Sequence, residues 1–138
     1  MRNIMRITCE DYMDVIWFAV DRDGHVIVAR SMESEIPEFV KCSSERTTAV
    51  AERLSFPRAV GRDRCGAFDA VKAVEGCGFY YYIADDPFDT VYRRVGMPER
   101  PCRAADLSWD VQELLANNRV AFSAAERPSF TICGGTVY

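Results

Sequence analysis

Residues 15–30 read VIWFAV, DRDG and HVIVAR, so that an apolar run, a polar tetrapeptide and a second apolar run follow without a break. Both apolar runs are rich in β-branched and aromatic residues, which are typical of strands. The tetrapeptide between them is rich in turn residues, and Gly24 can adopt a positive φ. The stretch therefore predicts a β-hairpin with strands over 15–20 and 25–30.

The composition is that of an ordinary globular domain. The chain has 138 residues, of which 49% are hydrophobic and 28% are charged. This length fits one domain and allows most of the apolar surface to be buried in a single core. We therefore predict a single domain over residues 1–138.

The remaining sequence predicts further strands and about three helices. The most aromatic run, Phe79–Tyr82, predicts a central strand over 78–84 that pairs with a strand over 90–95. Two short strands are predicted over 120–123 and 129–133. Apolar periodicity and capping residues predict three helices and a helical turn after Pro37. The first helix begins at Ser43 or Ser44 and runs to about Leu54, the second covers 67–75, and the third begins at Asp106 or Ser108 and ends at Asn117-Asn118. Gly76 is expected to cap the second helix, residues 58–66 to form a connection, and Gly134-Gly135 to loosen the tail. The expected fold class is α+β, with a mainly antiparallel sheet built from hairpins.

The charge balance excludes one class of function and favours another. The formal net charge is −4 and the isoelectric point is about 5.0. Binding nucleic acid without sequence preference needs a cluster of Lys and Arg, so a basic protein partner is expected instead. The first ten residues lack the apolar core of a signal peptide, and no apolar run is long enough to span a membrane. We expect a cytoplasmic protein.

The cysteines and the one histidine limit the possible chemistry. Six cysteines are spread along the chain without a C-x-x-C pair, and they are Cys9, Cys42, Cys65, Cys77, Cys102 and Cys133. In a cytoplasmic chain this spacing predicts free thiols rather than disulfides or a zinc site. Cys77 stands at the end of a predicted helix, where a thiol is not activated as a nucleophile. No cofactor motif is present, and we expect no cofactor.

Two Asp-rich turns raise the question of a metal ion. Asp21-Arg22-Asp23-Gly24 resembles the opening of a calcium loop, but apolar residues 26–28 occupy the positions where further oxygen ligands would follow. Asp85, Asp86 and Asp89 form the second turn, where aspartate is favoured because its side chain bonds the local backbone. We therefore predict two hairpin turns and no metal site.

Other residues have both a functional and a structural interpretation. Glu33, Glu35 and Glu38 stand beside Pro37, and two adjacent carboxylates can act as an acid and a base, but nothing in the sequence fixes their separation and a solvated loop is the favoured interpretation. His25 is the one candidate general base, although its place after a turn favours a cross-strand neighbour. The aromatic run could stack bases or sugars, but a core strand explains it more simply.

One resemblance adds to this interpretation. The order of residues 17–25, Ser31 and residues 36–40, followed by Tyr80-Tyr81-Tyr82, Tyr92 and Pro98, resembles small uncharacterised bacterial cytosolic proteins. Some small acidic proteins of this kind are immunity proteins that neutralise toxins. The resemblance implies a binding role and carries no active site with it.

The leading hypothesis is a non-catalytic binding protein, immunity-like, whose acidic surface meets a basic protein partner. The predicted binding residues are Glu33, Glu35, Glu38, Asp85, Asp86 and Asp89. One alternative is a small carboxylate-dependent enzyme with His25 as its base. Another is a homo-oligomeric structural module that associates through the aromatic strand.

Overall fold

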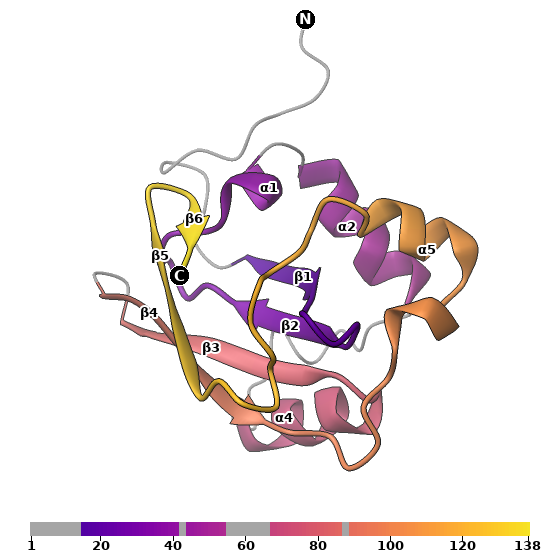
Figure 1. Cartoon of the computed structure of the whole chain (residues 1–138). Helices are drawn as coiled ribbons and strands as arrows, with labels where there is room; N and C mark the ends of the chain where they lie inside the picture. Colours follow the sequence, from indigo (N-terminus) through magenta and orange to yellow (C-terminus); the bar gives the residue numbers. More distant parts are fainter. Residues whose placement is uncertain (1–14, 42–43, 55–66, 87–88) are drawn as a thin grey trace, which may run out of the picture.

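The computed structural model describes residues 15–41, 44–54, 67–86 and 89–138, and at 44, 67–70, 85, 86 and 89 it describes the backbone alone. The described residues form an α+β fold in which short helices pack on a curled sheet (Figure 1). This confirms the predicted fold class.

Six strands form the sheet in the order β1-β2-β3-β4-β5-β6. They are β1 (Ile16–Val20), β2 (Val26–Arg30), β3 (Tyr80–Asp86), β4 (Asp89–Gly96), β5 (Ser129–Cys133) and β6 (Thr136–Val137). The pair β2–β3 is parallel and every other neighbouring pair is antiparallel. The predicted first hairpin is confirmed, with Ile16 opposite Arg30 and Val20 opposite Val26. The predicted hairpin of β3 and β4 is also present.

The described residues contain four α-helices and one 3-10 turn. They are α1 (Glu38–Lys41), α2 (Ser44–Arg53), α4 (Ala67–Gly76), η1 (Ala104–Asp106) and α5 (Trp109–Leu114). The predicted helices correspond to α2, α4 and α5, and α1 is the helical turn expected after Pro37. Among these helices none is long and apolar enough to cross a membrane. The connection predicted over 58–66 lies outside the described residues.

Helices α2, α4 and α5 cover the outer face of the sheet, while α1 packs on the inner face. Alternate strand residues point to the outer face, because side chains on a strand alternate between its two sides. Its buried cluster contains Phe18, Val20, Val26, Val28, Val50, Val74, Phe79, Tyr81, Val111 and Leu115. The period-2 apolar pattern of the strands therefore meets the period-3.6 pattern of α2, α4 and α5 in one core layer.

Trp17 lies at the centre of the inner face of the sheet, and none of its surface is exposed. Its ring makes edge contacts with Phe39, Tyr92 and Phe130, with ring centroids 5.9, 5.6 and 6.0 Å away. The indole N–H donates to the Tyr92 hydroxyl at 3.4 Å, and that hydroxyl donates to the backbone carbonyl of Glu35 at 2.8 Å. This network joins β1, β4 and β5 to the segment before α1.

The aromatic strand β3 is central, as predicted, since it lies between β2 and β4. Tyr80, Tyr81 and Tyr82 are buried, with exposed fractions of 3%, 0% and 0%. Their rings therefore pack inside the chain itself. A second copy, or a stacked base, would have to use a different surface.

The strand predicted over 120–123 is absent. Val120 and Phe122 are buried and Ala121 is exposed, an alternation that is typical of a strand. Instead of extending the sheet, the segment packs its buried side chains into the same cluster as Trp17. Val120 N–H donates to the Val20 carbonyl at 3.0 Å, and Val20 N–H donates to the Asn118 carbonyl at 2.8 Å. Arg22 N–H donates to the Phe122 carbonyl at 2.9 Å. One isolated bridge, between Val20 and Arg119, is all that remains of strand pairing there.

The tail prediction was also wrong. Gly134 and Gly135 have φ angles of 59° and 84°, and they join β5 to β6 in a tight hairpin. Two consecutive residues with positive φ are what a two-residue type I′ turn requires, and glycine accepts both without strain. The glycine pair thus orders the C-terminal hairpin.

The glycine that ends α4 is Gly78 and not Gly76. Gly78 has φ +87°, its N–H donates to the Glu75 carbonyl, and the following Phe79 N–H donates to the Val74 carbonyl. This is the Schellman arrangement, in which the left-handed residue follows the helix. Gly76 lies within the last turn of the helix.

The two glycines allow a matched stability test. A Cβ at Gly78 would lie 2.9 Å from Cys102 Cβ and would be strained at φ +87°. We expect Gly78→Ala to lower the free energy of unfolding by about 2–3 kcal/mol. A Cβ at Gly76 meets nothing within 4 Å. Gly76→Ala should leave stability unchanged or raise it by up to about 1 kcal/mol. Urea denaturation measures both, and equal effects would contradict the assignment of the cap.

Candidate functional site

Asp21 organises the turn between β1 and β2. Its side chain is 2% exposed and accepts three backbone hydrogen bonds. Oδ1 accepts from the N–H groups of Asp23 and His25, both at 2.9 Å, and Oδ2 accepts from Ala124 N–H at 2.7 Å. The carboxylate therefore closes the turn and attaches it to the segment that follows α5. Asp21 has the structural role in a hairpin turn that the sequence predicted.

Asp23 lies beside Asp21 and is exposed. Its Oδ2 accepts a hydrogen bond of 2.5 Å from the Ser123 hydroxyl. The Arg22 guanidinium is 3.9 Å from Asp23 Oδ1 and makes a shorter contact of 3.1 Å with Glu126. The arginine is thus directed mainly to Glu126, and one oxygen of Asp23 remains open to a further ligand.

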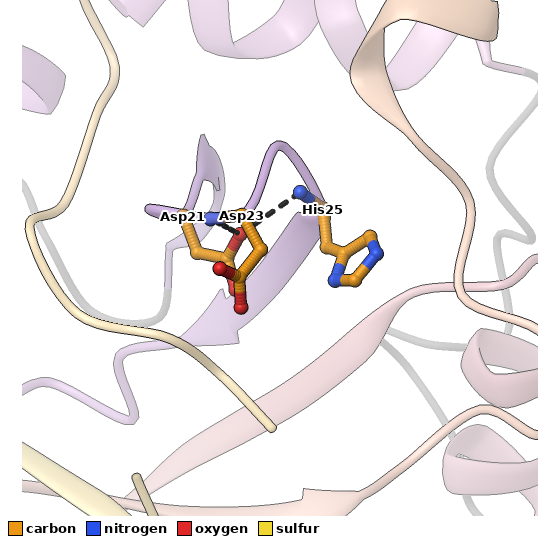
Figure 2. A group of neighbouring side chains, drawn as sticks. All are labelled: Asp21, Asp23 and His25. Atoms are coloured by element: carbon orange, nitrogen blue, oxygen red, sulfur yellow. Dashed lines mark hydrogen bonds between the residues drawn. The ribbon is translucent and has the colours of Figure 1, made fainter. Parts of the chain in front are cut away.

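His25 places its imidazole beside the two carboxylates (Figure 2). One ligand atom from each of Asp21, Asp23 and His25 lies within 4.8 Å of the others. The Nδ1 atom of His25 is shielded from solvent and has no hydrogen-bond partner among the described residues. The sequence did not predict this proximity, because the carboxylates are weighed as calcium ligands and His25 is weighed separately, as a general base or a cross-strand neighbour.

The neighbouring Tyr80 reports the electrostatics of the turn. Its ring centroid is 5.9 Å from that of His25. Burial raises the pKa of the Tyr80 hydroxyl, the charge of Asp21 raises it further, Arg94 opposes the change, and Asp23 adds to it. The two carboxylates therefore make this end of β2 a place that favours positive charge.

The described surface contains several hollows. Three of them have volumes of about 520, 420 and 230 Å³. The largest of these is lined by Glu75, Gly76, Cys77, Gly78, Met97, Glu99 and Arg100. His25 lines none of the three. A general base needs an adjoining space in which a substrate can lie within hydrogen-bond reach.

The thiols within the described residues are free, at Cys77, Cys102 and Cys133. Burial raises the pKa of Cys77, and it also raises that of Cys102, to which the charge of Asp106 and then that of Cys77 add. A raised thiol pKa lowers the fraction of the reactive thiolate. These two thiols therefore do not have the surroundings of an activated nucleophile.

The predicted acidic segment begins with a strained turn. The Ser34 N–H donates to the Ser31 carbonyl at 2.8 Å, and between them Met32 and Glu33 have φ angles of 48° and 71°. Residues other than glycine, asparagine and aspartate rarely adopt this backbone conformation. Met32 is 37% exposed and Glu33 is exposed, so the turn presents both side chains at the surface.

Glu35 differs from its neighbours because it is a structural residue. Its Oε2 accepts the Gly135 N–H at 2.7 Å and lies 3.6 Å from Lys41 Nζ. The Glu38 N–H donates to the Gly135 carbonyl at 2.8 Å, while the Glu38 side chain is exposed. The segment is therefore attached to the β5–β6 turn through Glu35, and Glu33 and Glu38 are the exposed members of this group.

The structure brings the two predicted acidic segments to the same end of the sheet. β2 and β3 run parallel, and the last pair in their register is Arg30 with Ile83. Residues 31–38 continue from β2, and Asp85, Asp86 and Asp89 belong to the adjoining ends of β3 and β4 (Figure 1). We name this region the acidic end, defined by Glu33, Glu35, Glu38, Asp85, Asp86 and Asp89. The Asp21–His25 turn lies at the opposite end of β2.

A second exposed feature was not predicted from the sequence. Trp109, the first residue of α5, is 73% exposed. Asp110 next to it has a lowered pKa, first because the Ser108 hydroxyl donates to it and further because Arg53 contacts it at 2.5 Å. The signal was available, since Trp109 falls outside the apolar stripe of Val111, Leu114 and Leu115.

The chain was compared with family models, with curated proteins and with solved structures, and none of the three comparisons gives a match.

Proposed function

We propose that the protein is a non-catalytic binding protein of the cytoplasm, which holds a basic protein partner at its acidic end in the manner of an immunity protein. One observation carries the proposal. Two acidic segments, 50 residues apart in sequence numbering at Glu35 and Asp85, leave adjacent parallel strands at the same end of the sheet. A patch assembled from distant parts of the chain supports a recognition surface better than one acidic loop does.

The charge of the acidic end supports a basic partner. Its six acidic residues exceed the four cations that belong to the same elements, namely Arg30, Lys41, Arg93 and Arg94. Lys41 is already paired with Glu35. Complementary charge accelerates encounter and excludes partners of the same sign, and its effect weakens as salt is added. We therefore expect binding that is selective for cationic surfaces and sensitive to salt.

The strained turn supplies an apolar contact within this charged surface. Met32 is 37% exposed and has a positive φ, as does Glu33. Residues held in such conformations cost about 1–3 kcal/mol each and are concentrated at functional sites. Methionine is also enriched at protein interfaces, where its flexible side chain adapts to a partner. Met32 is the side chain that we expect to be covered on binding.

Charge reversal tests the proposal. Glu33→Lys with Glu38→Lys, and Asp85→Lys with Asp86→Lys, change the net charge equally. Each immobilised variant is used to capture proteins from a bacterial lysate, and the affinity of the protein retained by the wild type is then measured. We expect both double variants to bind that protein at least about tenfold more weakly at low salt, or about 1.4 kcal/mol. High salt should release it from the wild type.

Glu99→Lys with Glu113→Lys is the matched control, because both residues are exposed and lie away from the acidic end. It should bind as the wild type does. The proposal fails if both acidic-end variants retain the partner unchanged, or if the control alone loses it. Loss in the control would move the interface to the surface around Trp109.

A further inference from the structure

We propose that the Asp21–His25 turn binds a divalent transition-metal ion, Zn²⁺, through the carboxylates of Asp21 and Asp23 and the imidazole of His25. This site is independent of the acidic end and does not rest on the proposed binding function.

The geometry of the three side chains fits one small cation. Their ligand atoms lie within 4.8 Å of one another, on residues that alternate along a tight turn (Figure 2). Zinc binds carboxylate oxygen and imidazole nitrogen at about 2.0–2.2 Å, so the atoms have to approach by roughly an ångström. Asp23 is exposed and can make this adjustment by rotation of its side chain.

An independent observation points to a ligand. His25 Nδ1 is shielded from solvent and has no hydrogen-bond partner among the described residues, and in Figure 2 one ring nitrogen is on the side of the carboxylates. A buried polar atom without a partner costs about 1–3 kcal/mol. The neutral imidazole is the commonest metal ligand in proteins, and coordination would remove this cost.

The surroundings hold the first ligand in place. Asp21 accepts hydrogen bonds from three backbone N–H groups, which fix the orientation of its carboxylate. One lone pair of Oδ2 is left for a metal ion. The Ser123 hydroxyl donates to Asp23 Oδ2 and keeps this carboxylate beside Asp21. Hydrogen bonds of this kind orient metal ligands and usually contribute tenfold or more to affinity. Arg22 opposes a cation, but it contacts Glu126 more closely than Asp23.

The donor set selects the type of ion. One imidazole with two carboxylates suits zinc and its neighbours among the transition metals, whereas calcium takes six to eight oxygen ligands. The residues after the turn, Val26, Ile27 and Val28, are buried and offer no side-chain oxygen. Three protein ligands leave positions for water, as in an open zinc site.

The single histidine of the chain makes the test specific. Zinc chloride is added to the ¹⁵N-labelled protein, and the imidazole nitrogen resonances, which all belong to His25, are followed by NMR. Zinc bound at cysteines elsewhere does not move them. We expect saturable shifts of these resonances and of the amides in the turn. Asp23→Asn should raise the zinc concentration at the midpoint at least about tenfold.

Glu113→Gln, which removes an exposed carboxylate on α5, is the control and should leave the midpoint unchanged. His25→Ala should abolish the amide shifts in the turn, and the unchanged amide spectrum elsewhere would show that it folds. The proposal is overturned if the imidazole resonances do not respond to zinc. It is equally overturned if Asp23→Asn titrates as the wild type does.

Discussion

Replacing Trp17 by alanine is expected to lower the free energy of unfolding by about 3–5 kcal/mol. The side chain is fully buried and makes edge contacts with three aromatic rings of the inner core. Its removal leaves a cavity and also deprives the Tyr92 hydroxyl of the indole donor. Equilibrium unfolding in urea, followed by circular dichroism, measures the change.

Trp109 is a matched control, because it is the only other tryptophan in the sequence and is 73% exposed. Trp109→Ala should change the free energy of unfolding by no more than about 0.5 kcal/mol. If the two substitutions had equal effects, the position of Trp17 at the centre of the core would be wrong.

Asp21→Ala is expected to cost about 3 kcal/mol, since it leaves three backbone N–H groups without their acceptor. One of these groups, that of Ala124, belongs to a hydrogen bond that is buried, so water does not replace the carboxylate easily there. Hydrogen bonds to a charged acceptor are also stronger than neutral ones. Thermal and urea unfolding at neutral pH measure the loss.

Asp23→Ala provides the comparison within the same turn. Asp23 is exposed and its Oδ2 accepts one hydrogen bond, from Ser123, so its loss should cost about 1 kcal/mol or less. Asp21→Asn should fall between the two, because it keeps an oxygen for two of the three N–H groups. An Asp21→Ala variant as stable as Asp23→Ala would contradict the anchoring role of Asp21.

Local patterns in the sequence predict the elements of this fold better than their pairing. The β1–β2 hairpin is determined by two adjacent apolar runs and a turn, so neighbouring residues suffice to predict it. The parallel pairing of β2 with β3 joins Ile27 to Tyr80, far apart in the chain. That pairing depends on how helices and core residues pack, and no local pattern contains it.

The segment 120–123 and the end of α4 differ from their predictions for different reasons. Val120 and Phe122 alternate in burial like a strand, but their backbone groups bond the end of β1 and the turn after it. Gly76 has the spacing of a helix cap, yet Gly78 satisfies the last carbonyls of α4. Tertiary contacts with β1 replace strand pairing at residues 120–123, whereas local hydrogen bonds of Gly78 and Phe79 set the end of α4.

The acidic end and the Asp21–His25 turn also depend on the folded arrangement of the chain. The residue types of the acidic end were predictable from the sequence, while the meeting of its two segments was not, since it requires the parallel register of β2 and β3. The separate role of Glu35 was also hidden, because its partner Gly135 is 100 residues away. Likewise, the position of His25 beside Asp21 and Asp23 depends on the shape of the turn.

NMR mapping at low salt tests most directly whether a basic partner binds at the acidic end. A short lysine-rich peptide is added to the ¹⁵N-labelled protein, and the amide shifts are assigned along the chain. We predict that the largest shifts fall in residues 31–38 and at Asp85, Asp86 and Asp89. Shifts centred on residues 106–113 around Trp109, or spread evenly over the surface, would contradict binding at the acidic end.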